Sequence, residues 1–283
     1  SIHNGIYING GGGHEVYTWH DDLVDDRNWQ PRRAVPGASK NDPVAAKTAV
    51  AYMEKVLGRS LNPADGNQFI GNRITGRGIH ATFTRNGVIK DNVITEVTCG
   101  TGPGIWLITF SNFWQVTGND VSHIADSGDT HFMQEGIRLG TASNYNLVSR
   151  NKVHDLGDDG RGIATDVDAS FNTFEYNTVT NVPIGYNDEM SGWGNIWRNN
   201  TVSNFSILGF GFRMKDRVLK LPSKDTSTHM SIVTNNIASG GRKGAAGLSI
   251  GAIAGSKFSG NTFGKINLGA YVAGYWAKQG NTW

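Results

Sequence analysis

One short pattern recurs along most of the chain, and it constrains the fold more than any other feature. An apolar residue, two variable residues, an asparagine, one variable residue and a second apolar residue return at intervals of about 20 to 35 residues. The copies are IKDNVI at 89–94, VTGNDV at 116–121, VSRNKV at 148–153, FEYNTV at 174–179, WRNNTV at 197–202, IVTNNI at 232–237 and FSGNTF at 258–263. The repeated asparagines are Asn72, Asn92, Asn119, Asn151, Asn177, Asn200, Asn235, Asn261 and Asn281. Such a period is typical of a solenoid, in which each repeat forms one coil.

A second pattern keeps the same phase: a glycine followed by an apolar, a variable and usually another apolar residue. Its copies are GIHA at 78, GIWL at 104, GIRL at 136, GIAT at 162, GYND at 185, GFRM at 211, GLSI at 247 and GAYV at 269. The chain contains 38 glycines and 27 asparagines among 283 residues, and both residue types favour turns over helix interiors. Each period therefore contains at least two short alternating strands with a glycine or asparagine corner.

These patterns predict a parallel β-helix. A single coil cannot bury its apolar residues, whereas stacking coils about 4.8 Å apart pairs every strand and fills the interior. Asparagine suits the corners because it tolerates the left-handed conformation and because stacked amides can hydrogen-bond along the axis. A β-sandwich is the competing interpretation, but it does not predict one phase kept over eight periods. The predicted fold class is all-β, with one domain over residues 1–283.

Residues 10–67 do not follow the repeat. Within them, 43–57 has a helical pattern, with Asp42 as N-cap, Pro43 in the first turn and Gly58 after the end. We expect an insertion that lies on or beside the solenoid, or a helix that caps one of its ends. GIYI at 5–8 resembles a repeat strand placed before the insertion. No polar cap is evident at the last repeat, so a further chain segment or a second subunit is expected to cover that end.

Composition excludes several classes of protein. Only 18% of residues are charged and the net charge is +2, which argues against a coiled coil or a basic nucleic-acid binder. The single cysteine, Cys99, excludes an intrachain disulfide framework, and the eight histidines show no zinc-ligand spacing. No apolar run approaches the roughly 20 residues of a membrane span, and no signal peptide is recognised. We therefore expect no nucleic-acid or membrane partner.

Alternation places polar side chains on one outer face of the solenoid. After each glycine, the first and third residues should face inward, and the second and fourth outward. The middle coils then expose three carboxylates and a lysine, and amide, arginine and tryptophan side chains lie nearby. The set is Asp166, Asp168, Glu189 and Lys215, with Asn187, Arg138, Arg213 and Trp106. Neighbouring carboxylates repel, which raises one pKa unless a cation intervenes, and such a pair suits acid–base chemistry. The alternative interpretation is a solvated polar face with no chemistry.

Two further expectations concern individual residues. By the same alternation Asp188 should face inward, which is costly for a carboxylate, so a local bulge is expected to bring it outward in place of Glu189. Two coils carry long loops, 126–135 and 216–228, and in such folds loops often gather on the binding face. In the first of them His131, with Asp129 and Glu135, is a further candidate substrate-binding residue.

Over about residues 68–283, the repeat resembles the right-handed parallel β-helix superfamily, the pectin-lyase-like fold. The resemblance implies a secreted protein active on polysaccharide, because that superfamily contains polysaccharide lyases, glycoside hydrolases and epimerases, although it also contains phage tailspikes. TDVD at 165–168, NDE at 187–189 and RMK at 213–215 are similar in order and type to motifs of polygalacturonase-type hydrolases. The chain departs from that family in lacking its Gly-His-Gly element and in having Ala164 where the family has asparagine.

Three functions follow as hypotheses. The first is a glycoside hydrolase without a cofactor, in which Asp166, Asp168 and Glu189 or Asp188 supply the acid and base. Its substrate would be held by Arg138, Arg213, Lys215, Asn187, Trp106 and His131. The second is a Ca²⁺-dependent lyase for a uronic-acid polymer, with the metal on Asp166, Asp168, Asn187 and Glu189 and with Lys215 or Arg213 as the base. The third is a glycan-binding or spike protein that cleaves nothing.

Overall fold

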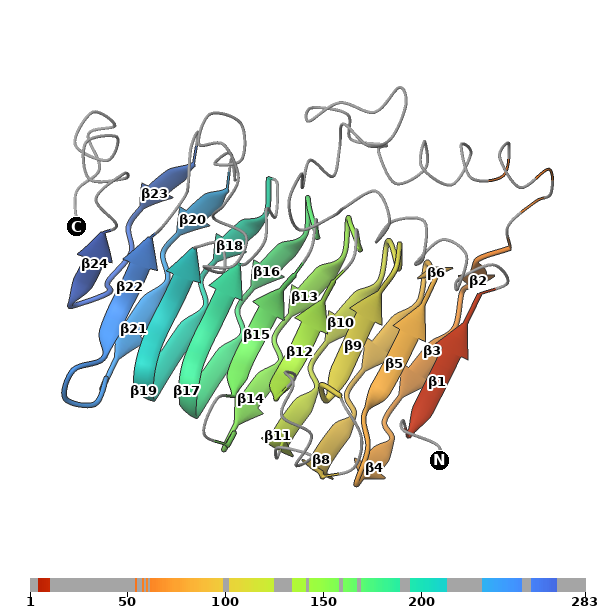
Figure 1. Ribbon diagram of the computed structural model, residues 1–283, viewed down its shortest axis with the longest axis horizontal. Coiled ribbons are helices and arrows are strands. Elements are labelled where there is room, and N and C mark those ends of the chain that lie inside the picture. The colour runs from red at the N-terminus through yellow and green to blue at the C-terminus, as the bar shows by residue number, and fades with distance from the viewer. Residues whose placement is uncertain are drawn as a thin grey trace.

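The structure is a computed structural model of the whole chain. It describes residues 5–10, 54, 58, 60, 62–98, 102–124, 134–140, 143–157, 160–166, 169–188, 194–212, 231–250 and 256–268. The elements it delineates are β-strands, which stack in rows along one long axis (Figure 1). Among these residues, no helix has the length and apolar character needed to cross a bilayer.

The strands form three faces. Face 1 consists of β1 (Ile6–Asn9), β5 (Ile79–Thr82), β9 (Ile105–Ile108), β12 (Glu135–Leu139), β15 (Arg161–Thr165), the C-terminal parts of β17 (Thr178–Asp188) and β19 (Thr201–Phe212), β22 (Ala246–Ile250) and β24 (Ile266–Leu268). Face 2 consists of β4 (Arg73–Thr75), β8 (Val93–Val97), β11 (Asp120–Ile124), β14 (Lys152–His154), the N-terminal parts of β17 and β19, and β21 (Ile237–Ser239). Face 3 consists of β3 (Gln68–Ile70), β7 (Val88–Lys90), β10 (Gln115–Thr117), β13 (Leu147–Ser149), β16 (Thr173–Glu175), β18 (Ile196–Arg198), β20 (Ile232–Thr234) and β23 (Lys257–Ser259). The short pair β2 (Ala64–Asp65) and β6 (Thr84–Arg85) lies at a corner.

Strand pairing is parallel on every face, as the examples β9–β12, β11–β14 and β13–β16 show. Each coil runs from face 3 to face 2 to face 1 and then begins the next coil. Faces 1 and 2 join into one 14-stranded sheet because β17 and β19 continue across the corner between them. The predicted right-handed parallel β-helix is therefore confirmed, and the sandwich is excluded.

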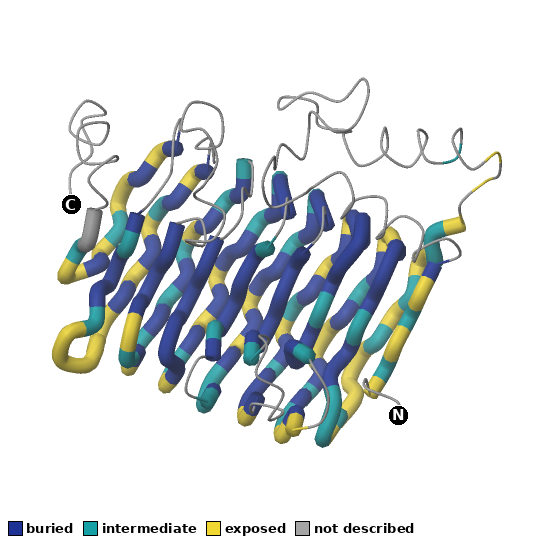
Figure 2. Tube along the Cα trace, viewed as in Figure 1, coloured by how far each residue is buried: buried dark blue, intermediate teal, exposed yellow. Residues whose placement is uncertain are grey.

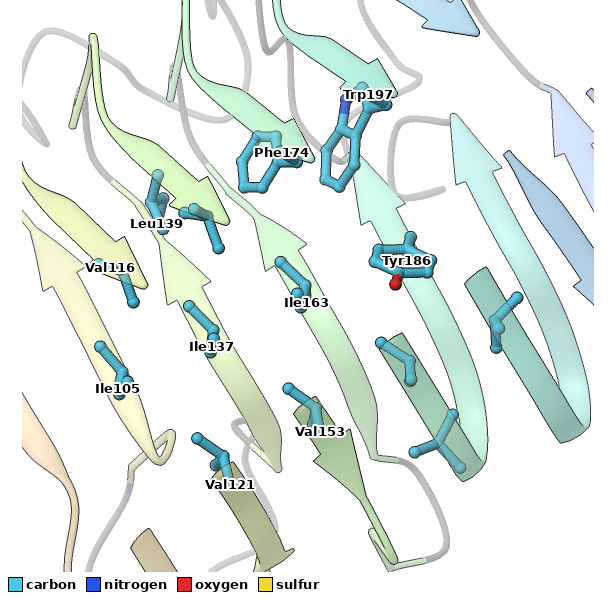
Figure 3. Packing of buried hydrophobic residues seen from close by; sticks show 14 of the residues in the cluster. Ile105, Val116, Val121, Ile137, Leu139, Val153, Ile163, Phe174, Tyr186 and Trp197 are labelled. Atoms are coloured by element: carbon cyan, nitrogen blue, oxygen red, sulfur yellow. The ribbon is translucent and has the colours of Figure 1, made fainter. Parts of the chain in front are cut away.

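Apolar side chains from all three faces fill the interior. Figure 3 shows Ile137 and Ile163 of face 1 pointing toward the same space as Val153 of face 2 and Phe174 of face 3. These residues are fully buried, and burial of such a side chain contributes about 1.5–3 kcal/mol. Figure 2 shows the buried segments continuing through the central coils, with exposed residues gathered at the corners and the ends. The inward positions predicted by alternation are confirmed for these strands.

A buried asparagine ladder runs along the corner between faces 3 and 2. Within it, Asn151 donates from Nδ2 to Asn177 Oδ1 at 3.0 Å and to the Val116 carbonyl at 2.8 Å. Its own Oδ1 accepts from the backbone N–H and the Nδ2 of Asn119 at 3.0 and 2.9 Å. All four hydrogen bonds of the amide are thus made inside the protein. The ladder consists of Asn72, Asn92, Asn119, Asn151, Asn177, Asn200, Asn236 and Asn261.

The ladder corrects two expectations. Asn236, rather than Asn235, is the seventh member. The left-handed conformation falls on the residue just before each ladder asparagine, and not on the asparagine itself. These residues are Gly71, Asp91, Gly118, Arg150, Tyr176, Asn199, Asn235 and Gly260. The preceding residue turns the chain, which leaves the asparagine free to direct its amide along the ladder.

A second, shorter asparagine ladder was not predicted from the sequence. Asn146 donates to Asn172 Oδ1 at 3.1 Å, and Asn172 donates to Asn195 Oδ1 at 3.4 Å, at the corner between faces 1 and 3. Each of these asparagines stands two residues before the central apolar residue of a face 3 strand. That spacing is a periodic signal in the sequence that could have revealed the ladder.

The strand register corrects the phase of the glycine pattern in the later coils. Tyr186 pairs with Phe210 and Asp188 with Phe212, so GFGF at 209–212 continues face 1 in place of GFRM at 211. Gly209 and Gly211 both satisfy the glycine pattern. Phe210 stacks on Tyr186 with ring centroids 4.6 Å apart, so the copy that begins at Gly209 is the one that continues face 1. At the next coil β24, rather than GAYV at 269, pairs with β22.

The N-terminal strand GIYI pairs in register with β5, as predicted, with Ile6 beside Ile79 and Tyr7 beside His80. Most of the expected insertion at 10–67, including the helix predicted at 43–57, lies outside the described residues, as does the chain from 269 onward.

Candidate functional site

A row of side chains points outward from face 1, one from each successive strand, and its later members Arg138, Ala164 and Asn187 are buried. We call it the outer row. Parallel pairing places its members side by side in the order Tyr7, His80, Trp106, Arg138, Ala164 and Asn187. They are the second residues after each glycine. The predicted placement of Trp106, Arg138 and Asn187 in one line is therefore confirmed, although their roles stay predictions.

Aromatic rings form the first half of the outer row. The His80 imidazole stacks on the Trp106 indole with ring centroids 4.4 Å apart, and the Tyr7 ring lies 4.9 Å from His80. The Arg138 guanidinium carbon stands 5.7 Å from the centre of the Trp106 ring, within the range of a cation–π contact. The row therefore changes from an apolar surface to a charged one at Arg138.

Arg138 is the centre of a charge cluster. It donates to Glu135 Oε1 at 2.9 Å through Nη1 and pairs with Asp166 through Nη2. Arg161 donates to the same Glu135 oxygen at 2.8 Å. The Glu135 side chain is 1% exposed and the Arg138 side chain 8%, so two guanidinium groups neutralise a buried carboxylate. Removal of one member would leave an uncompensated buried charge.

Glu135 was expected in a loop with His131. It is instead the first residue of β12, pairs with Arg161 of β15, and belongs to the Arg138 cluster. The ion pair of Glu135 with Arg138 could not be predicted from strand alternation, because alternation places residues three apart on opposite faces of a strand. The glycine between them, Gly136, was the available signal for an irregular strand.

Asp166 follows directly after β15, and its backbone N–H donates to the Leu139 carbonyl at 2.8 Å. Its side chain is partly exposed on the outer surface, where it meets Arg138. Across from it Gly140 leaves space: a Cβ there would stand 3.6 Å from Asp166 Cβ and 3.8 Å from both Arg138 Nε and Trp106 Nε1. The outward position predicted for Asp166 is confirmed.

Asp188 faces the interior, so the expected bulge that would turn it outward is wrong. It is completely buried and accepts hydrogen bonds from Thr165 Oγ1 at 2.8 Å, Trp197 Nε1 at 3.1 Å and Asn195 Nδ2 at 3.2 Å. These three donors offset the cost of burying the carboxylate. The irregularity in this strand lies earlier, between Val182 and Ile184. With no access to solvent, Asp188 has a structural position.

Five of the predicted site residues lie outside the described part of the chain. They are Asp168, Glu189, Arg213, Lys215 and His131. The paired-carboxylate arrangement of Asp166 with Asp168 or Glu189 therefore stays a prediction. Of the four predicted Ca²⁺ ligands, the structure describes Asp166 and Asn187, and Asp166 already carries a guanidinium partner that would compete with a metal. Among the described residues, no three histidine, cysteine, aspartate or glutamate side chains gather as a metal site.

Unsatisfied polar atoms concentrate on this surface. His80 Nδ1, Trp106 Nε1, Glu135 Oε2 and Arg138 Nε are buried and have no hydrogen-bond partner in the parts of the chain that the structure describes. A buried polar atom without a partner costs about 1–3 kcal/mol. Four such atoms lie on three neighbouring strands, which makes this part of face 1 the candidate site.

Burial lowers the pKa of His80 to about 4, so the folded protein holds this imidazole neutral at pH 7. The unfolded chain binds the proton near pH 6.5. Between these values the unfolded state holds more protons, so stability should fall as the pH falls from 6.5 to 4, by at most about 3 kcal/mol, and should be fully retained above 6.5. Urea unfolding at pH 7 and pH 4.5 checks this, and His80→Gln should have a flatter pH dependence. Equal slopes for the two proteins would contradict the burial of a neutral His80.

Fold and outer row together define a class: a parallel β-helix protein with a row of polar and aromatic side chains on one face. The structure is similar to a crystal structure of a mutant of the periplasmic alginate epimerase AlgG, with a TM-score of 0.52 and 16% identity, over 77% of this chain and 53% of that chain. A double mutant of the same epimerase gives a TM-score of 0.48 and 18% identity over the same shares. The chain thus spans about half the length of these structures, and the likeness shows the fold. No protein-family model matches the sequence, and no curated protein is similar to it in sequence.

Proposed function

We propose that this protein is an enzyme that binds a polysaccharide along the outer row and hydrolyses its glycosidic bonds. The observation that carries the proposal is the outer row itself, where the stacked rings of His80 and Trp106 lie beside the paired Arg138 and Asp166. A sugar presents hydroxyl groups and apolar ring faces together, and ligand sites combine apolar surface with a few placed polar groups in the same way. As the sequence also suggests, we expect the protein to act outside the cytoplasm.

Asp166 is the carboxylate we assign to the chemistry. Glycoside hydrolysis needs two carboxyl groups beside the scissile bond, one to protonate the leaving oxygen and one to activate water or attack the sugar. Asp166 is the partly exposed acid of the described outer surface, and Asp168 or Glu189 is the expected second carboxyl group. Glu135 holds Arg138 from the other side, so Arg138 can orient Asp166 without turning away from it.

A polysaccharide lyase is the second candidate, and the position of Arg138 in the outer row is the observation that favours it. From this position Arg138 could bind the carboxylate of a uronic-acid unit. Lys215 or Arg213, the bases expected from the sequence, would take the proton beside that carboxylate. The bond to the glycosidic oxygen would break as a carbon–carbon double bond forms, and the departing oxygen would take a proton from water.

A polysaccharide panel distinguishes these reactions. Incubation of the protein with neutral and acidic polymers, with and without EDTA, should release new reducing ends without ultraviolet absorbance if the protein is a hydrolase. Absorbance of an unsaturated product would instead identify the lyase. Binding to a polymer without either product would identify a glycan-binding protein, and no binding to any polymer would contradict the proposal.

Replacement of Asp166 by asparagine should lower kcat by about 10²–10⁴-fold, the usual contribution of a general acid or base. The fold should survive, because the amide can still accept a hydrogen bond from Arg138. The matched control is Asp65→Asn, which removes the same charge from an exposed aspartate–arginine pair with Arg85, away from the outer row. Steady-state kinetics on the cleaved polymer check the prediction, and wild-type kcat in Asp166→Asn would remove Asp166 from the chemistry.

A further inference from the structure

The outer row extends well beyond the charge cluster, to the last described strand on that side of face 1. Tyr7 occupies this position on β1, and its side chain is 51% exposed. Its ring is tilted by 59° relative to the His80 ring, so the two do not cover each other face to face. A large aromatic side chain is therefore presented to solvent at the end of a line of rings that leads to Arg138 and Asp166.

We propose that Tyr7, supported by His80 and Trp106, forms a distal subsite that binds sugar units of a long polysaccharide chain away from the reacting bond. This inference rests on the proposed function of the outer row. Its ligand is the face of a pyranose ring, whose C–H groups pack on the apolar face of an aromatic side chain while the phenol hydroxyl can bond a sugar hydroxyl.

Strand spacing sets the length of ligand that the subsite requires. From β1 to β15 the order is β1, β5, β9, β12 and β15, which is four steps. With about 4.8 Å for each step, Tyr7 and Asp166 stand about 19 Å apart along the axis. A single sugar cannot reach both residues, whereas an extended oligosaccharide parallel to the axis can. The subsite should therefore act only on long chains.

The rings between Tyr7 and the charge cluster are held in place. His80 is fixed by its hydrogen bond to Thr82 and by its stacking on Trp106, and Trp106 is covered in turn by Arg138. A binding surface whose side chains are already ordered loses little conformational entropy when the ligand arrives. Tyr7 thus ends a preformed surface and is not an isolated exposed ring.

Tyr176 provides a matched control because it is also a tyrosine and is 50% exposed. It lies at the corner between faces 3 and 2, where its ring meets the Arg150 guanidinium at 5.3 Å. Exposure and residue type are alike in the two positions, whereas Tyr176 lies outside the outer row, in the left-handed conformation and against Arg150. An effect of Tyr7 that Tyr176 lacks therefore reports on the row.

The test uses the polymer that the wild-type protein cleaves, together with a series of its oligosaccharides of increasing length. Tyr7→Ala should raise KM for the polymer about tenfold, the order expected for loss of one aromatic contact, and leave kcat/KM for the shortest cleaved oligosaccharide unchanged. Tyr7→Phe should retain most of the affinity, and Tyr176→Ala should behave as the wild type. If the wild type binds without cleaving, the same comparison is made with dissociation constants.

An equal loss on short and long substrates, or no loss on the polymer, would overturn the distal subsite while leaving the proposed function in place. Failure of the wild-type protein to bind or cleave any polymer would overturn both. Urea unfolding of Tyr7→Ala is included, and if the alanine variant does not fold, Tyr7→Leu, which keeps an apolar side chain but lacks the ring, is compared with the wild type on the same length series and should lose affinity for the polymer alone.

Discussion

Replacing Asn151 by alanine is expected to lower the free energy of unfolding by about 3–6 kcal/mol. Asn151 is buried in the middle of the ladder, and its amide makes four hydrogen bonds with the two neighbouring coils. Its loss would leave the backbone N–H and Nδ2 of Asn119 without their acceptor, and the carbonyl of Val116 without a donor. Water has no ready access to these groups, so each bears much of its desolvation cost.

The matched control is the exposed first member, Asn72, whose amide donates to Asn92. Asn72→Ala should cost less than about 1 kcal/mol, because solvent can replace the lost partner. Circular dichroism during urea unfolding measures both variants. Similar losses at the two positions would show that the ladder is a consequence of coil stacking and contributes little to its stability. Asn151→Asp should be at least as harmful as alanine, since it sets a carboxylate oxygen against Asn177 Oδ1.

Substitution of Asp188 by alanine should be the second most disruptive change, with a loss of about 3–5 kcal/mol in unfolding free energy. The substitution leaves Thr165, Asn195 and Trp197 with buried donors and no acceptor, and it opens a cavity beside the Trp197 ring. Chemical unfolding measures the stability, and activity per folded molecule is determined at low temperature. That activity should be largely retained, because the Asp188 carboxylate is inaccessible.

The Asp188→Asn variant distinguishes a structural role of the carboxyl group from a role in the reaction. Its carbonyl oxygen can still accept from Asn195 and Trp197, and its amide nitrogen can donate to the hydroxyl of Thr165, which reverses its role. We therefore expect near wild-type stability and activity from the asparagine variant. A stable asparagine variant without activity would show that the carboxyl group takes part in the reaction and would contradict a purely structural position.

The sequence predicted the solenoid and the first part of the outer row because both depend on periodicity. Alternation within GIWL, GIRL and GIAT places Trp106, Arg138 and Asp166 outward, and the strand register agrees. Periodicity could not predict contacts between side chains. Asp188 stays inward because Thr165, Asn195 and Trp197 donate hydrogen bonds to it, and Glu135 pairs with Arg138 although the two residues lie three apart in β12. Neither partner set is visible in a repeat pattern.

The other wrong predictions placed a repeat one or two residues away from its true position. Gly209 and Gly211 both begin a glycine-apolar pattern, and both Asn235 and Asn236 stand in a corner. The contacts in the structure distinguish the two members of each pair. Phe210 stacks on Tyr186, and the side-chain oxygen of Asn236 accepts a hydrogen bond from the amide of Asn200. Sequence periodicity cannot distinguish two residues of the same type that lie one or two positions apart in the chain.

The asparagine ladder also keeps a constant spacing although the coils that it joins differ in length. Consecutive members lie between 20 and 36 residues apart in the chain, yet their Nδ2 to Oδ1 distances stay between 2.9 and 3.1 Å. The column of amides thus keeps its spacing whatever the number of residues between its members. The segments between ladder members can therefore be lengthened, shortened or exchanged, by natural selection or by design, with the supporting coils preserved.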